Sequence, residues 1–107
     1  MGQMSFAEFA ASVVRESGPP SGLSAALNAL WHDARGDWSR AHTHAQEADG
    51  PNGAWVHAYL HRKKGDLDNA AYWYARAGRS RPADDVTLPA EWELIARELL
   101  GDRKTAA

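Results

Sequence analysis

The sequence predicts an all-α protein of about six helices, and three observations lead to this fold class. Ala, Leu, Glu, Arg and Lys, which cost least in a helix, dominate the 107-residue chain, whereas β-branched residues are few and scattered. Runs rich in Gly and Pro divide the chain into segments of helical length. Two of these segments repeat one another. We therefore expect one helical domain over residues 1–107, with two stacked hairpins between terminal helices.

The first helix is expected at about residues 5–17. Ser5 and Glu8 have the spacing of a capping box, in which the Ser hydroxyl accepts from a free backbone amide and the Glu side chain reaches back. A stripe of apolar residues follows at helical spacing. The Gly-Pro-Pro-Ser-Gly run at residues 18–22 ends this helix, because Pro lacks a backbone donor and restricts the residue before it.

Two helical hairpins are expected at about residues 22–49 and 53–79. When residues 25–48 are aligned with residues 54–77, each unit has a Gly-Asp pair at its turn. The Gly can take the left-handed conformation that ends the first helix, and the Asp can cap the second. Small residues occupy the positions where paired helices approach closely. The identical pairs are Ala25/Ala54, Ala29/Ala58, His32/His61, Gly36/Gly65, Asp37/Asp66, Ala41/Ala70 and Ala48/Ala77.

The last helix is expected at about residues 88–100. Pro89 suits its first turn, and Gly101 suits its end. Two hairpins alone leave the ends of a stacked array uncovered, so we expect this helix to cover the second hairpin. Its apolar stripe consists of Trp92, Ile95, Ala96 and Leu99.

The stretch from Ala54 to Pro82 resembles a tetratricopeptide repeat. The matching positions are Ala58 in the first helix, Gly65-Asp66-Leu67 at the turn, Ala70, Tyr74 and Ala77 in the second helix, and Pro82 at the end. The resemblance implies a helical-repeat scaffold that offers a concave surface to a peptide or partner segment and needs no catalytic group. The run over residues 54–79 is also similar to small bacterial proteins of unknown function, a likeness that carries no activity with it.

A row of aromatic and basic side chains in the second hairpin is the candidate binding surface. Trp55, Tyr59 and Arg62 follow one another at spacings of four and three, so they share a helix face, beside Asp33 of the first hairpin. Aromatic rings give large contact area, and Arg pairs with a carboxylate in two-pronged fashion. We expect a non-catalytic module that binds a peptide or protein partner in this groove. In the alternative, a terminal helix covers the row and makes it core.

Three histidines give a second hypothesis, a histidine-dependent or metal-dependent enzyme. His57 and His61 are four apart, the spacing with which one helix holds zinc, nickel or copper. His32 occupies the place of His61 one repeat earlier, so the three rings can converge. In the alternative, these rings pack inward with hydrogen-bonded nitrogens and no cofactor is required. His42 and His44 are two apart and therefore face different ways, which argues against their joining the site.

Composition and motifs argue against several function classes. The chain has no Cys, hence no thiolate metal site or Cys nucleophile, and it has no phosphate loop, G-x-S-x-G elbow or H-E-x-x-H pair. Its net charge of -2 disfavours nucleic-acid binding, although Arg62-Lys63-Lys64 and nearby aromatics offer a local basic patch.

The chain is expected to be cytoplasmic and to have no membrane partner. No apolar run approaches the roughly 20 residues of a membrane span, and the start of the chain lacks the features of a signal peptide. Tyr72 and Trp73 lie off the inward stripe of their helix, so they are either covered or form an exposed patch through which the protein can dimerise.

Overall fold

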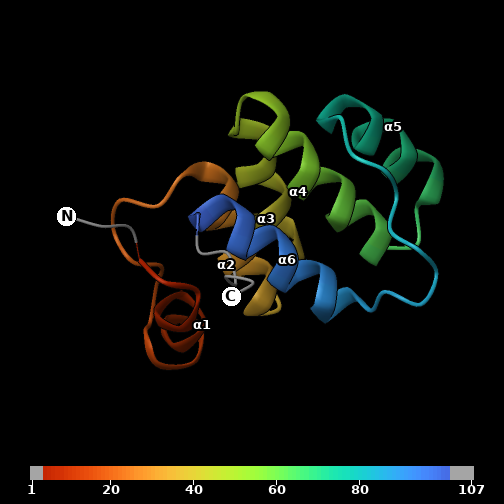
Figure 1. Cartoon of the computed structure of the whole chain (residues 1–107). Coiled ribbons are helices and arrows are strands. Elements are labelled where there is room, and N and C mark those ends of the chain that lie inside the picture. The colour runs from red at the N-terminus through yellow and green to blue at the C-terminus, as the bar shows by residue number, and fades with distance from the viewer. Residues whose placement is uncertain (1–3, 102–107) are drawn as a thin grey trace.

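The computed structural model describes residues 4–101, which contain six α-helices (Figure 1). No strand occurs among these residues, so the predicted all-α class is confirmed. None of the described helices is long and apolar enough to cross a membrane. The helices are α1 (Phe6–Arg15), α2 (Ala25–Ala34), α3 (Trp38–Glu47), α4 (Gly50–Lys63), α5 (Leu67–Ala77) and α6 (Leu88–Leu100).

Local capping signals set most of the helix ends. The capping box of α1 is present: the amide of Glu8 donates to Oγ of Ser5 at 3.1 Å, and the amide of Ser5 donates to Oε1 of Glu8 at 2.9 Å. At the first hairpin turn, Asp37 caps α3 by accepting from the amide of Arg40 at 3.1 Å. Gly65, at the second turn, has φ +82, which confirms the predicted left-handed conformation.

The start of α4 differs from the prediction, which began the second hairpin at about residue 53. The helix begins at Gly50, because Pro51 stands in the first turn, where its missing amide has no intrahelical partner to lose. Gly53 lies so close to the end of α3 that a Cβ there would be 2.4 Å from the carbonyl oxygen of Ala48. A residue without a side chain therefore lets α3 and α4 meet with only Ala48 and Asp49 between them.

The helices pair as two hairpins, α2 with α3 and α4 with α5, and α3 and α2 both pack against α4. The last helix covers more than the second hairpin. It lies across α2 and α4 (Figure 1) and also touches α1. The indole of Trp92 donates to the carbonyl of Leu30 at 3.0 Å and stacks on Phe9 with a centroid distance of 5.7 Å. This placement puts α6 over the face where an open groove was expected.

Small side chains set the distance between α4 and α5, and replacing them should destabilise the fold. Ala58 and Ala70 are both 0% exposed. We expect Ala58→Leu and Ala70→Leu each to lower the free energy of unfolding by about 1 to 3 kcal/mol, because extra methylenes force the paired helices apart. Urea denaturation measures this, with the exposed Ala71→Leu as the control. Equal stability of all three variants would contradict the close packing.

Candidate metal centre

Three histidines from two helices meet over the middle of α4. His42 comes from α3, and His57 and His61 come from α4, and one ring nitrogen of each lies within 4.8 Å of the other two. Nε2 of His57 is 2.9 Å from Nε2 of His42. The rings of His57 and His61 stack with a centroid distance of 4.9 Å, as their spacing of four residues predicts. The trio thus joins neighbouring hairpins.

The third histidine is not the one that the repeat indicated. His32 instead stacks on His44, with a centroid distance of 5.1 Å and an interplanar angle of 3°. The reason is the position of α3, which packs against both α2 and α4. His42 and His44 do face different ways, as predicted, but one of these faces meets His57 and His61. The inference that His42 weakens the case for a metal site was therefore wrong, because its ring lies beside those of His57 and His61.

Two tryptophans hold the ring planes of the trio. The indole of Trp38 stacks on His42 with a centroid distance of 4.9 Å, and that of Trp73 stacks on His57 at 4.0 Å. Trp38 is itself fixed by its Nε1, which donates to the carbonyl of Leu60 at 3.0 Å. The imidazoles are therefore restrained before any ligand binds. This is the arrangement that a preorganised site requires.

Two of the three histidines have a lowered pKa. Burial, with smaller contributions from the neighbouring His42 and His61, lowers the pKa of His57 to about 4. Burial also lowers the pKa of His42, with a smaller contribution from His61. A neutral imidazole keeps one nitrogen lone pair free, which is the form that coordinates a metal ion.

A carboxylate stands behind His61. Asp66 was expected to cap α5, but its side chain makes no capping bond. Its Oδ2 accepts from Nδ2 of Asn69 at 2.6 Å, which lowers the pKa of Asp66, and lies 3.8 Å from Nδ1 of His61. With Nδ1 directed at a carboxylate, Nε2 is the nitrogen left for the trio. Ligating histidines usually have such a partner on their second nitrogen.

The lowered pKa of the buried His57 predicts that acid destabilises the metal-free protein. Unfolded, His57 has a pKa of about 6.5, and folded it has a pKa of about 4. The unfolded state therefore binds the extra proton between these values, so the stabilisation is complete above about pH 6.5 and is lost as the pH falls towards 4. We expect a loss of about 2 to 3 kcal/mol from this group. Chemical denaturation at pH 7 and pH 4.5 should give a steeper loss for the wild type than for His57→Gln, and equal losses would contradict the assignment.

The predicted aromatic row does not line an open groove. Trp55 is 4% exposed and Tyr59 is 2% exposed, so both belong to the core. The hydroxyl of Tyr59 donates to Oδ2 of Asp33 at 2.9 Å, and Arg62 donates to Oε1 of Glu91 on α6 at 2.7 Å. The expectation of a peptide groove here was wrong, and the alternative, a terminal helix over the row, is what the structure shows.

The structure also leaves little of the basic patch and of the exposed aromatic patch that the sequence suggested. Arg62 pairs with Glu91, and Nζ of Lys63 pairs with Oδ1 of Asp33 at 2.9 Å, so neither is free to bind phosphate. Among the described aromatic residues, Tyr72 is the one with a largely exposed side chain, at 53%. Trp73 is half-buried against His57.

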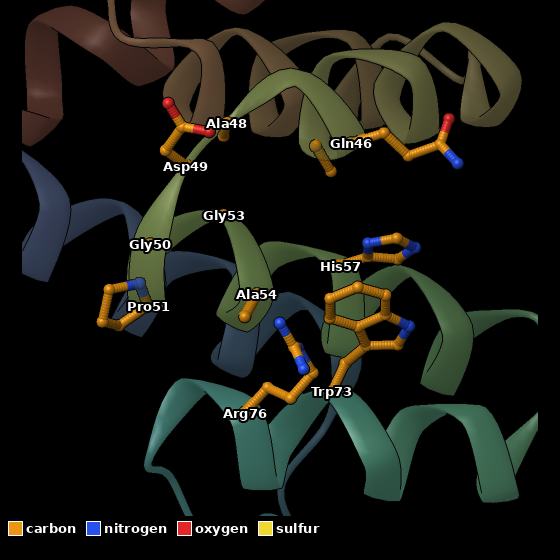
Figure 2. Close-up of a pocket in the computed structure, with 11 residues that line it drawn as sticks. Gln46, Ala48, Asp49, Gly50, Pro51, Gly53, Ala54, His57, Trp73 and Arg76 are labelled. Atoms are coloured by element: carbon orange, nitrogen blue, oxygen red, sulfur yellow. The ribbon is translucent and has the colours of Figure 1, made fainter.

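A cavity of about 510 Å³ opens beside the trio (Figure 2). His57 forms one end of it, Trp73 and Arg76 of α5 form one wall, and the junction of α3 and α4 forms the other. The sequence analysis noted Trp73 but did not anticipate the cavity or Arg76. The available signal was the run of small residues around the α3–α4 junction, Ala45, Ala48, Gly53 and Ala54.

Comparison with known proteins gave no match: no protein-family model, no curated protein and no solved structure is significantly similar to this chain.

Proposed function

We propose that this protein binds a divalent transition-metal ion through His42, His57 and His61. The observation that carries the proposal is the convergence of three imidazoles, one ring nitrogen of each within 4.8 Å of the others. Zinc–nitrogen bonds of 2.0–2.1 Å in a tetrahedral site place ligand nitrogens about 3.3 Å apart. The 2.9 Å between the Nε2 atoms of His42 and His57 is shorter than this separation, and distances of up to 4.8 Å within the trio are longer, so the rings must turn when the ion binds.

The donor set selects the class of metal. Imidazole nitrogens suit Zn²⁺, Ni²⁺ and Cu²⁺, whereas Mg²⁺ and Ca²⁺ prefer oxygen ligands. Three protein ligands leave a fourth tetrahedral position for water or for an atom of a bound molecule. Asp66 supports the proposal, because its carboxylate lies 3.8 Å from Nδ1 of His61 and makes no capping bond to α5. Metal binding replaces the peptide groove as the leading function, and it retains the histidine hypothesis with His42 in place of His32.

The test is calorimetric titration of the metal-free full chain, made without a histidine tag, with ZnCl₂, NiCl₂ and MgCl₂. We expect one equivalent of zinc to bind with a Kd on the order of micromolar or tighter, and no binding of magnesium. The matched control is His44→Gln, which removes a histidine two residues from His42 on the other side of α3. It should bind zinc like the wild type. Absence of zinc binding at 100-fold higher concentrations, or loss of binding in His44→Gln alone, would contradict the proposal.

A further inference from the structure

We propose that the cavity beside His57 binds a carboxylate attached to an apolar body, and that this binding is coupled to the metal. The inference rests on the proposed metal function, because the same histidine serves both ligands. The carboxylate accepts hydrogen bonds from Nδ1 of His57 and from the guanidinium of Arg76. Its apolar body lies against Trp73.

The first support is the second nitrogen of His57. Nε2 lies against His42, so Nδ1 is the remaining polar atom of the ring, and no described residue hydrogen-bonds to it. Within residues 4–101, no fully buried side-chain nitrogen or oxygen lacks a partner. Nδ1 of His57 therefore reaches solvent, although the residue is only 5% exposed. The cavity that His57 lines is the solvent space next to this ring.

The second support is the state of Arg76. No carboxylate among the described residues forms an ion pair with it, in contrast to Arg62 and Arg79. Its guanidinium lies 5.6 Å from the ring centre of Tyr72 and 5.5 Å from that of Trp73. In Figure 2 the guanidinium extends from α5 towards the cavity, on the same side as the ring of His57. A planar cation in this position is a two-pronged partner for a carboxylate.

The third support is the rest of the cavity wall. The side chains of Ala45, Ala48 and Ala54 and the indole of Trp73 form its apolar part, and polar groups line about half of it. A volume of about 510 Å³ matches the size of pockets that bind small organic molecules. Asp49 lies on the other side, at the α3–α4 junction (Figure 2), and is the charged group that opposes an anion. The occupant thus combines one carboxylate with an apolar group.

The coupling follows from imidazole chemistry. A metal on Nε2 of His57 fixes the tautomer with a proton on Nδ1, so Nδ1 becomes a hydrogen-bond donor. Ligating histidines almost always give this proton to a carboxylate, carbonyl or water, and a carboxylate raises the basicity of the ligating nitrogen. For His61 the nearby carboxylate is Asp66, 3.8 Å from Nδ1, whereas for His57 the bound molecule supplies the carboxylate. Each ligand must then raise the affinity of the other by the same factor.

The test titrates the full-length chain, metal-free and zinc-loaded, with phenylacetate and with its neutral analogue phenylacetamide. We expect the zinc-loaded protein to bind phenylacetate at least 10-fold more tightly than the metal-free protein does, and to bind phenylacetamide at least 10-fold more weakly. Arg76→Gln should lose this preference for the acid, and Asp49→Asn should strengthen binding of the acid. A tripeptide Ala-Ala-Phe with a free or an amidated C-terminus shows whether the carboxylate belongs to a small molecule or to a peptide end. The amidated form should not bind in either case.

The two proposals fail in different ways. Zinc binding in carboxylate-free buffer without any binding of phenylacetate or free tripeptide would overturn the cavity proposal and leave the metal site intact. Carboxylate binding that is unchanged in Arg76→Gln would indicate direct ligation of the metal and would also overturn it. If zinc does not bind at all, the metal proposal fails first, and the coupling fails with it.

Discussion

Arg62→Met is expected to lower the free energy of unfolding by about 3 to 5 kcal/mol, as expected for breaking a buried ion pair. The carboxylate of Glu91 is buried, with 2% of the residue exposed, and it accepts from Arg62 at 2.7 Å and from the hydroxyl of Tyr74 at 2.5 Å. Arg62 also donates to the carbonyl of Val86, in the segment that leads into α6. Loss of the guanidinium leaves a buried charge without its counter-ion and releases this segment.

Urea denaturation measures the loss of stability in Arg62→Met, and two further variants serve as controls. Arg40→Met removes a largely exposed pair with Asp37 and should cost less than about 1 kcal/mol. The double variant Arg62→Met/Glu91→Gln removes the charge but keeps an acceptor for Tyr74, so it should recover at least half of the loss. A cost for Arg62→Met no larger than that for Arg40→Met would show that α6 is not held over α4 by this pair.

His57→Gln is expected to weaken zinc binding by about 100-fold or more. Changing a residue behind a ligand costs 10- to 100-fold in metal affinity, so loss of a ligand itself should cost at least as much. His42→Gln and His61→Gln should behave alike, and Asp66→Asn should cost about 10-fold. Competition with a chromophoric chelator measures each Kd, and circular dichroism checks that each variant is folded.

The controls for the zinc variants are the two histidines that stack on each other elsewhere. His32→Gln and His44→Gln should leave the zinc Kd within about twofold of the wild type, because these rings face α2 and α3 and not the trio. A large loss in His32→Gln with none in His42→Gln would restore the site that the repeat indicated and would contradict the present assignment.

Local sequence signals predicted the helices well because each helix end depends on a few neighbouring residues. Ser5 with Glu8, Asp37 and Gly65 act within one turn of the chain, so their roles can be read without the fold. The start of the second hairpin was predicted at about residue 53 rather than at Gly50, because Gly and Pro occur both in breaks and at helix starts. The relation to tetratricopeptide repeats stays a prediction, since no comparison tests it.

The candidate site was only half predictable, because its parts come together through tertiary packing. The spacing of His57 and His61 on one helix is a local property, and the structure keeps them together. His42 joins them because α3 packs against α4. No pattern in the sequence near His42 predicts that packing. Likewise Trp55 and Tyr59 have the spacing of a surface row, but Glu91, 29 residues beyond Arg62, brings α6 over them. The spacing of residues along a helix predicts which of them share a face. It does not predict which other element packs against that face.

X-ray absorption at the zinc edge of the loaded, tag-free protein tests the metal site most directly. We predict a four-coordinate zinc with three imidazole nitrogens at about 2.0 to 2.1 Å and one oxygen or nitrogen ligand at the fourth position. His42→Gln should reduce the imidazole count, whereas His32→Gln should leave the spectrum unchanged. A spectrum of oxygen ligands alone, or an imidazole shell that is the same in the wild type and in His42→Gln, would contradict the site formed by His42, His57 and His61.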